Sequence, residues 1–442
     1  MSTPSSIHIP AVKKPFDAVV RIPGSKSITN RALPIAAMAE GASTLTNVLF
    51  ADDTQRMIEA LKVLGFELTV DAAGQTIHVR GQGGRIPAKE SELFCGNSGT
   101  TIRFLAALCA VGTGVHVLDG IERMRQRPIG ELADALKALG GSVEWLGRPG
   151  FPPLKVGGKG LAGGTCKFVD TQSSQFISAV LMSAPLARSP VDVVLEGPVT
   201  SEPYVLMTLA IMRQFGVNST TKANPGAAKE TRESRTFRVL APQTYKARNY
   251  QIEPDASNAS YFLAAAALIP GASVTISGLG RDSLQGDVLF AEVLRQMGAD
   301  VEIHPDQIRV TGTKKLSGLT INMNAIPDLV QTLAVLALFA DGPTRIYDVG
   351  NLRVKETDRL EALKTELQKM GAVVATLTDS ITIFPPKQVT SARISTYEDH
   401  RMAMAFAVAG VRVGVEIENP QCTAKTYPEF FTDFLAATRE KA

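Results

Sequence analysis

The sequence predicts an α/β fold in which one supersecondary unit is repeated six times. The first observation behind this prediction is an amphipathic segment that ends in a large apolar residue followed by glycine. Glycine is preferred just beyond the last turn of a helix because it adopts the left-handed backbone conformation without steric cost. The pattern occurs at Leu64-Gly65, Leu139-Gly140, Phe215-Gly216, Met297-Gly298 and Met370-Gly371.

A second family of predicted helices alternates with the first. Each member opens with Ser or Asp, which are good N-caps, and then runs through Ala and large apolar residues on every face. Helices that are apolar all round belong inside a packed domain. We therefore predict buried helices over residues 27–40, 98–111, 173–186, 257–270, 328–341 and 399–408.

Short alternating segments follow the amphipathic helices and predict strands, for example at 142–145, 300–303 and 372–376. The unit is then strand, buried helix, strand, amphipathic helix, strand, strand. The alternative is a chance recurrence in a generic α/β protein, which five matched helix ends disfavour.

Chain length and the last unit predict the domain organisation. A chain of 442 residues should form two or three domains. After an amphipathic segment at 428–438 the sixth unit lacks its closing strands, and strand-like runs at 7–9 and 18–22 precede the first helix. We expect these N-terminal strands to complete the last repeat. Domain I would then comprise residues 1–24 plus 253–442, and domain II residues 25–252. The polar stretch 220–235 is predicted to be an exposed loop of the third unit.

Composition excludes several classes of function. The net charge of +3 and the single Trp145 disfavour a nucleic-acid-binding protein. The five histidines have no metal-ligand spacing, the four cysteines form no CxxC pair, and no apolar run reaches transmembrane length. We expect a cytoplasmic protein with reduced thiols and without a metal or a membrane partner; a removed plastid transit peptide is the alternative.

The chemistry-bearing residues concentrate at helix starts. Lys26, Ser27 and Arg31 open the first buried helix directly after Pro23-Gly24. Amide N–H groups and the positive end of the helix dipole would add to the two side-chain charges and favour a phosphate or carboxylate. This stretch is not a Walker A loop, because Ser25 stands where that motif needs glycine. The competing interpretation is a capped helix with a solvated lysine.

The same placement recurs along the chain, although a cap or a solvated face could explain many single clusters. The stretch 351–359 is harder to explain in this way, since five of its last seven residues are charged. Together the clusters predict a small, multiply anionic ligand in a cleft between the domains. The further clusters lie at 96–103, 123–128, 173–175, 201–204, 328, 355–356 and 399–401.

These motifs and their order resemble the 5-enolpyruvylshikimate-3-phosphate synthase family of enolpyruvyl transferases. The resemblance runs nearly end to end through PGSKS-x-x-NR (23–31), GN-x-GT-x-x-R (96–103), RPIG (127–130), SSQF (173–176), S-x-PY (201–204), DAS-x-ASYFLAAAA (255–267), IPD (326–328), N-x-RVKETDR (351–359), DHRMAM (399–404) and C-x-AK-T-x-P (422–428). It implies two domains of three βαβαββ units each, an inside-out α/β barrel, with the active site in the interdomain cleft. It also implies transfer of the enolpyruvyl group of phosphoenolpyruvate to the 5-hydroxyl of shikimate 3-phosphate.

Site residues follow from the resemblance position by position. Contacts to shikimate 3-phosphate are implied for Lys26, Ser27, Arg31, Ser173, Ser174, Gln175, Ser201, Tyr204, Asp328, Asn351 and Lys355. Contacts to phosphoenolpyruvate are implied for Lys26, Asn97, Gly99, Arg127, Gln175, Arg359, Arg401 and Lys425. The implied catalytic groups are Lys26, Asp328 near the attacking hydroxyl, and Glu356 near the methylene carbon. Thr100, Arg103, Asp399 and His400 should lie beside the site. No cofactor is implied, and we expect a monomer that glyphosate inhibits.

Two departures and two rivals accompany the resemblance. Many relatives have proline where this chain has Phe104, and aspartate where it has Leu206. The UDP-N-acetylglucosamine enolpyruvyl transferases place asparagine at the position of Ser27 and a cysteine in the loop where Arg125 and Gln126 stand. The other rival is a non-catalytic anion-binding or RNA-end-binding protein built from βαβαββ repeats.

Overall fold

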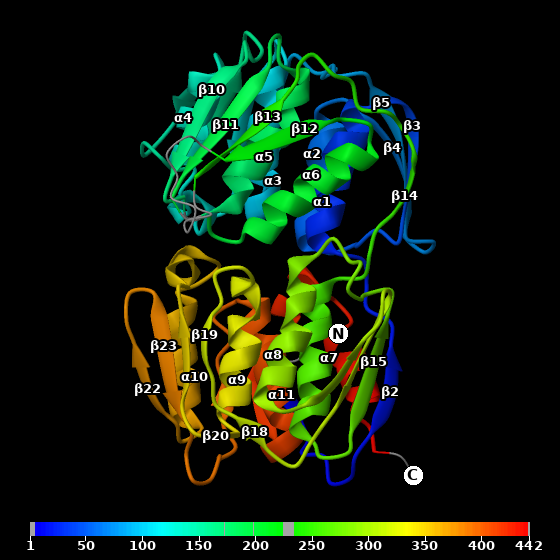
Figure 1. The fold of residues 1–442 in the computed structure, drawn as a ribbon. Coiled ribbons are helices and arrows are strands. Elements are labelled where there is room, and N and C mark those ends of the chain that lie inside the picture. Colours follow the sequence, from blue (N-terminus) through cyan, green and yellow to red (C-terminus); the bar gives the residue numbers. More distant parts are fainter. Residues whose placement is uncertain (1–4, 172, 198, 224–233, 441–442) are drawn as a thin grey trace. The chain divides into compact units, whose positions relative to one another are not determined.

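The chain folds into two compact units in the computed structural model, which describes residues 5–171, 173–197, 199–223 and 234–440 (Figure 1). Unit 1 comprises Met1–Pro23 and Glu253–Ala442, and unit 2 comprises Gly24–Ile252. Because unit 1 contains both ends of the chain, the backbone passes between the units twice.

Unit 2 consists of three βαβαββ repeats. In each repeat the first two strands pair in parallel around a buried helix, and the last two add antiparallel to give a four-stranded sheet. The first repeat contains β14 (Asn249–Gln251), α1 (Lys26–Met38), β3 (Glu40–Thr46), α2 (Asp52–Val63), β4 (Glu67–Asp71) and β5 (Thr76–Gln82). The second contains β6 (Glu90–Phe94), α3 (Gly99–Val111), β7 (Val115–Asp119), η1 (Met124–Gln126), α4 (Gly130–Ala138), β8 (Ser142–Trp145) and β9 (Leu154–Gly157). The third contains β10 (Gly164–Val169), α5 (Ser174–Ser183), η2 (Ala184–Leu186), β11 (Val191–Glu196), α6 (Glu202–Gln214), β12 (Ser219–Ala223) and β13 (Arg235–Val239).

Unit 1 repeats this plan, except that the described sheet of its sixth repeat has three strands. The fourth repeat contains β2 (Asp17–Val20), α7 (Ala256–Leu268), β15 (Ser273–Ser277), η3 (Gly286–Leu289), α8 (Phe290–Met297), β16 (Asp300–Ile303) and β17 (Gln307–Thr311). A short parallel pair, β18 (Leu316–Ser317) and β20 (Ala340–Asp341), lies between repeats. The fifth contains β19 (Thr320–Asn322), η4 (Pro327–Leu329), α9 (Val330–Ala337), β21 (Thr344–Tyr347), η5 (Gly350–Val354), α10 (Arg359–Lys369), β22 (Val373–Thr376) and β23 (Ser380–Phe384). The sixth contains β24 (Arg393–Ile394), α11 (His400–Val413), β25 (Val415–Glu418), η6 (Pro420–Lys425), α12 (Phe430–Ala437) and β1 (Ser6–Ile9).

The prediction that the N-terminal strands complete the last repeat is half wrong. Strand β1 pairs antiparallel with β25, as expected, but β2 pairs in parallel with β15 of the fourth repeat. The reason lies in the chain crossings. Strand β14, which precedes α7 in sequence, is paired with β3 in unit 2, so the edge of β15 lacks the parallel strand that every other repeat has. Strand β2 fills that edge.

The five predicted helix ends are confirmed in detail. Each glycine has a positive φ, between 84° and 105°, and its N–H donates to the carbonyl three residues earlier. The next N–H donates to the carbonyl five residues earlier, as in Phe66 to Leu61. These paired bonds define a Schellman motif, which satisfies carbonyls that a helix end otherwise leaves open. The shared ends occur at Gly65, Gly140, Gly216, Gly298 and Gly371.

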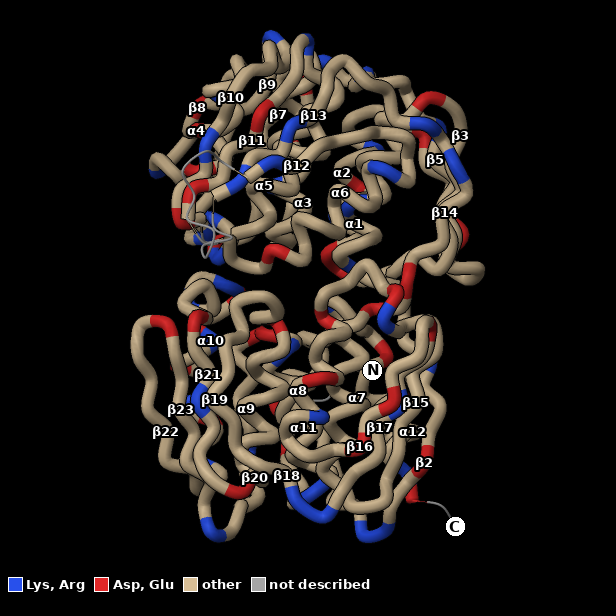
Figure 2. Tube along the Cα trace, in the orientation of Figure 1, with Lys and Arg blue, Asp and Glu red and all other residues tan. Residues whose placement is uncertain are grey.

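The apolar helices form the interior, as predicted. Helices α7, α9 and α11 pack against one another in unit 1, and α3 packs against α1 and α5 in unit 2 (Figure 1). Helices α7 and α9 contain no Lys, Arg, Asp or Glu and are tan throughout in Figure 2. Against this apolar interior, the polar residues at the starts of the buried helices are conspicuous.

Some predicted boundaries are wrong. Helix α9 ends at Ala337 and is preceded by a 3-10 turn that contains Asp328, whereas α11 continues to Val413. The predicted loop 220–235 begins and ends in strand, because β12 and β13 pair antiparallel; residues 224–233 lie outside the described part. Among the described residues, no helix is both long and apolar enough to cross a bilayer.

Candidate active site

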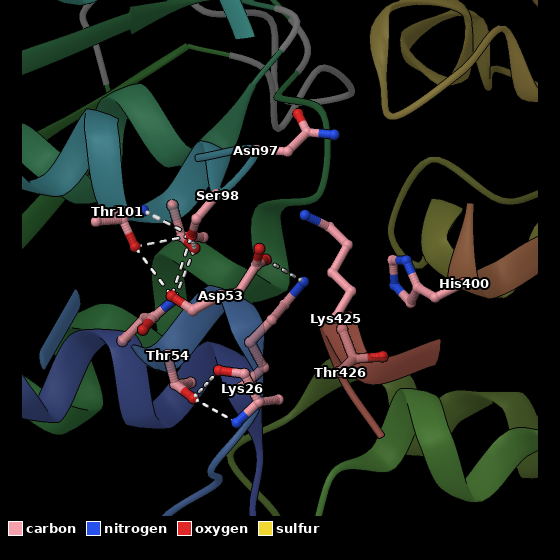
Figure 3. A network of polar contacts seen from close by, with 12 residues as sticks. Lys26, Asp53, Thr54, Asn97, Ser98, Thr101, His400, Lys425 and Thr426 are labelled. Atoms are coloured by element: carbon pink, nitrogen blue, oxygen red, sulfur yellow. Dashed lines mark hydrogen bonds and ion pairs between the residues drawn. The ribbon is translucent and has the colours of Figure 1, made fainter. Parts of the chain in front are cut away.

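The first helix of unit 2 begins with the predicted lysine. Ser25 is the N-cap of α1 and accepts a hydrogen bond from the N–H of Ile28 (3.4 Å). This cap fixes Lys26 as the first helical residue, and its Nζ lies 3.2 Å from Oδ2 of Asp53 (Figure 3). The Asp53 carbonyl accepts hydrogen bonds from the hydroxyls of Ser98 (3.3 Å) and Thr101 (3.2 Å). The starts of α1, α2 and α3 are thereby tied together.

Arg31 lies one turn further along α1 and is buried. Its guanidinium donates to the Thr208 hydroxyl (2.7 Å), the Ser27 carbonyl (2.9 Å) and the Tyr204 carbonyl (3.3 Å). Among its hydrogen bonds within the described residues, none goes to a carboxylate. Burial lowers the pKa of Arg31 to about 10. A buried cation held by neutral groups is suited to an incoming anion.

Phe104, which stands where many relatives have proline, contacts this arginine. Phe104 is buried on α3, and the guanidinium carbon of Arg31 lies 5.1 Å from the centre of its ring. The Tyr204 ring centre lies 5.8 Å from the same carbon. Both distances permit cation–π attraction. Phe104 therefore supports a predicted site residue.

Arg127 is held beside the start of α3. Its Nη1 donates to the carbonyl of Asn97 (3.0 Å) and to the Oδ1 of the same residue (3.3 Å). The guanidinium packs against Gly99, where a Cβ atom would lie only 2.7 Å from Nη2. Arg127 is 4% exposed, and its position depends on the absence of a side chain at Gly99.

Arg103 and Gln175 form a second pair in unit 2. Nη1 of Arg103 donates to Oε1 of Gln175 (2.6 Å), and Nη2 donates to the Pro128 carbonyl (3.2 Å). This bond fixes the position of the amide oxygen of Gln175, and therefore also the orientation of its NH2 group. Ser173 is the N-cap of α5 and accepts from the Gln175 N–H, and Ser174 is the first residue of that helix. Thr100 accepts a hydrogen bond from Asn30 (2.8 Å).

Ser201 precedes α6 in a left-handed conformation, with φ of 59°. No side-chain cap bond from Ser201 accompanies it within the described residues. This conformation is uncommon for a residue other than glycine and is frequent at functional sites. Tyr204 follows within the first turn of α6.

In unit 1, Arg359 is the centre of a buried charge network. Its Nε donates to Oδ2 of Asp399 (2.7 Å), its Nη2 to Oε2 of Glu356 (2.8 Å) and its Nη1 to Oδ1 of Asp328 (3.3 Å). Burial alone would lower the pKa of Arg359, but the three carboxylates raise it above its ordinary value. The guanidinium is therefore a permanent cation at this place.

Arg401 enters the network from the first turn of α11. Its Nη2 donates to Oδ2 of Asp328 (2.8 Å), and its Nη1 donates to the hydroxyl of Tyr261 (3.4 Å). Asp399 is the N-cap of α11 and accepts from the Arg401 N–H (2.9 Å). Burial raises the pKa of Tyr261 to about 12 although Arg401 opposes this shift, so the phenol remains a neutral hydrogen-bonding group.

The two predicted lysines complete the network of unit 1. Nζ of Lys355 lies 3.6 Å from Oδ1 of Asp328, and Nζ of Lys425 lies 3.9 Å from Oε1 of Glu356. Asn351 is buried in η5, and its Oδ1 has no hydrogen-bond partner within the described residues. His400 is buried beside Asp399, with Nδ1 3.6 Å from Oδ1. Four cations thus surround Asp328, Glu356 and Asp399.

Sequence reasoning missed Asp53 and Tyr261, which contact predicted site residues. An acidic residue in the first turn of an amphipathic helix ordinarily complements the helix dipole, so Asp53 gave no distinctive signal. Within the described part of the chain, no group of three or more His, Cys, Asp or Glu could hold a metal ion.

Comparisons with known proteins identify the family of the chain. The model of the EPSP synthase (3-phosphoshikimate 1-carboxyvinyltransferase) family matches residues 11–434. The 3-phosphoshikimate 1-carboxyvinyltransferase of Nostoc punctiforme is 46% identical over 97% of this chain and 98% of its own length. That of Erwinia tasmaniensis is 47% identical over 94% and 95%.

Solved structures agree with the fold. The EPSP synthase of Acinetobacter baumannii superposes with a TM-score of 0.79 at 26% identity and covers 97% of both chains. The enolpyruvyl transferase NikO of Streptomyces tendae gives 0.73 at 17% identity over 98% of both chains, a likeness of fold alone. The two-unit α/β repeat fold is that of the enolpyruvyl transferases, and the chain belongs to the EPSP synthase (3-phosphoshikimate 1-carboxyvinyltransferase) family.

Proposed function

We propose that the protein transfers the enolpyruvyl group of phosphoenolpyruvate to the 5-hydroxyl of shikimate 3-phosphate and releases inorganic phosphate. The observation that carries this proposal is the Arg359 network, in which four cations converge on carboxylates that can move protons. Family membership supports the same activity.

The chemistry has two steps, and both need proton transfer. In the first, the hydroxyl oxygen bonds to C2 of phosphoenolpyruvate, the hydroxyl proton leaves, and C3 gains a proton to become a methyl group. In the second, the C2–O bond to phosphate breaks and the methyl group loses a proton, which restores the double bond. General acid–base groups and fixed positive charge suffice for such a reaction.

We assign the proton transfers to Asp328 and Glu356. Asp328 would accept the hydroxyl proton, and Glu356 would serve the C3 carbon. Cations of unit 1 pair with both carboxylates, so a bound anionic substrate could take over part of that pairing and leave a carboxylate oxygen available. Arg359, Arg401 and Lys425 would then hold the phosphate and carboxylate of phosphoenolpyruvate.

We further propose that the residues of unit 2 serve the same site. Lys26, Asn97, Gly99, Arg127 and Gln175 would contact phosphoenolpyruvate. Shikimate 3-phosphate would contact Lys26, Ser27, Arg31, Ser173, Ser174, Gln175, Ser201 and Tyr204 from unit 2, and Asp328, Asn351 and Lys355 from unit 1. Binding would draw the two units together and exclude water from the tetrahedral intermediate. Small-angle scattering should then show a smaller radius of gyration with saturating shikimate 3-phosphate. An unchanged profile would count against closure.

Phosphate release tests the activity directly. The purified protein should release phosphate from phosphoenolpyruvate with shikimate 3-phosphate, and not with shikimate or UDP-N-acetylglucosamine. Release with UDP-N-acetylglucosamine would favour the related transferase, and release with neither acceptor would leave a binding protein. We also propose that the protein is a monomer, which sedimentation would test. It should need no cofactor, and glyphosate should inhibit it in competition with phosphoenolpyruvate; the phosphate-release assay tests both points.

A further inference from the structure

The segment that leads into α11 makes a tight turn with an unfavourable backbone. The Asp399 N–H donates to the Thr396 carbonyl (2.9 Å), which closes a four-residue turn. Its central residues, Tyr397 and Glu398, have φ of 55° and 54°. Two successive positive φ values are typical of type I′ turns, which favour Gly, Asn and Asp because other side chains crowd the backbone. This turn therefore needs support from contacts outside it.

That support comes from a carboxylate on α10. Glu366 is fully buried, and its Oε1 accepts from the Tyr397 hydroxyl (2.7 Å). Its Oε2 accepts from the Ser395 N–H (3.1 Å) and from Nζ of Lys369 (2.7 Å). Two of these donors belong to the segment just before Asp399, and Lys369 neutralises the charge. A buried carboxylate with such partners is a rigid anchor, because losing one partner leaves charge that water cannot reach.

The anchor and Arg359 lie on the same helix. Glu366 follows Arg359 by two helical turns, so both side chains leave the same face of α10. Arg359 binds Asp399, which in turn caps the helix that carries Arg401. Helix α10 thus holds the segment at two points, through Glu366 before the turn and through Arg359 after it. The position of Arg401 relative to Arg359 depends on both.

We propose that Glu366 and Tyr397 are positioning residues for the phosphoenolpyruvate-binding cations of unit 1, an inference that rests on the proposed function. They act through the turn and through Asp399. Loss of the Tyr397–Glu366 bond would let the turn relax toward ordinary φ values and shift Asp399 and Arg401 together. The contacts that unit 2 makes with shikimate 3-phosphate would be unaffected.

Tyr397→Phe is the decisive variant, since it removes one hydroxyl from a partly exposed ring. We expect the KM for phosphoenolpyruvate to rise about fivefold, the effect of one hydrogen bond, with little change in the KM for shikimate 3-phosphate. Glu398→Gln is the matched control, because it changes an exposed side chain of the same turn and should keep wild-type constants. Glu366→Gln, which keeps an acceptor, should impair the KM for phosphoenolpyruvate less than Glu366→Ala.

Hydrogen exchange separates this inference from the proposed function. In Tyr397→Phe the amides of Asp399 and Arg401 should exchange about fivefold faster than in the wild type, whatever the substrate. Unchanged exchange and an unchanged KM for phosphoenolpyruvate would overturn the positioning role. Equal increases in both KM values together with a lowered Tm would also overturn it, because they indicate a general loss of stability. A wild-type protein that releases no phosphate would refute the proposed function, while exchange would still decide whether the turn is anchored.

Discussion

Gly99 and Arg127 are in such close contact that a methyl group on Gly99 would lie 2.7 Å from Nη2, 3.0 Å from Cζ and 3.1 Å from Nη1 of the arginine. Three atoms of one guanidinium would therefore be crowded at once. The arginine is buried and hydrogen-bonded to Asn97, so it cannot move without losing those bonds. Arg127 can occupy this position only because residue 99 is a glycine.

Gly99→Ala should therefore weaken phosphoenolpyruvate binding. We expect its KM to rise about tenfold, equivalent to about 1.4 kcal/mol, while the thermal midpoint changes little. The matched control is Gly130→Ala at the start of α4, where a Cβ would meet nothing nearer than the Cα of Gly150 at 3.4 Å. Steady-state kinetics of both variants decide the matter, and a wild-type KM in Gly99→Ala would show that Arg127 can be displaced without consequence.

Asp53 should matter for catalysis through Lys26. The ammonium and the carboxylate are 3.2 Å apart and both largely buried. Asp53→Asn removes the charge that orients the lysine, and a hydrogen bond between charged groups is worth about 1.5–3 kcal/mol. We expect kcat/KM to fall by at least about tenfold. Asp52→Asn, the exposed neighbour in the same helical turn, should behave as the wild type; equal activity of the two variants would contradict the role of Asp53.

Buried thiols predict a loss of stability at high pH. Burial raises the pKa of Cys166 and of Cys422 to about 12, and it raises the pKa of Cys95 and Cys109 further. In the unfolded chain the same thiols ionise near pH 8.5. Above that pH the unfolded state binds fewer protons than the folded state, so stability present below about pH 8.5 falls as pH rises toward 12.

Two measurements check this prediction. The urea midpoint should decrease steadily above about pH 9. At pH 8 a thiol reagent should modify the cysteines of the folded protein slowly. After unfolding, the same reagent should modify all four cysteines rapidly. Rapid native labelling, or a midpoint that is constant up to pH 11, would show that the thiols are accessible.

The sequence predicted those parts of the fold that follow from local backbone chemistry. Gly65 and its four counterparts mark Schellman ends because only a left-handed residue closes a helix in that way. The pairing of β2 with β15 was not predictable, since alternating apolar residues at 18–22 fit the edge of either sheet. Which edge is free depends on β14, more than 200 residues away in sequence.

Some residues of the candidate site could be predicted from the sequence, and others could not. Asp328 and Arg401 stood out because they lie at the starts of predicted buried helices, and Glu356 and Arg359 because they belong to a dense run of charges at the start of an amphipathic helix. The structure joins all four in one network. Asp53 could not be distinguished from an ordinary dipole-compensating residue. Their roles toward substrates stay predictions, since roles depend on where ligands bind.

Glu356→Gln should separate proton transfer from charge pairing. The amide oxygen of glutamine can still accept the hydrogen bond that Arg359 now donates to Glu356 (2.8 Å), so the side chain should keep its place. The amide cannot exchange a proton with the C3 carbon of the substrate. General acid–base catalysis contributes about 100- to 10,000-fold, and we expect kcat to fall within that range.

Binding provides the second half of this test. The affinity for shikimate 3-phosphate, measured by calorimetry, should change less than about threefold, because Glu356 is not among its proposed contacts. Glu361→Gln on the exposed side of α10 serves as the control and should retain wild-type turnover. A kcat of Glu356→Gln within about threefold of the wild type would remove Glu356 from the proton-transfer scheme and leave Asp328 as the acid–base group for both steps.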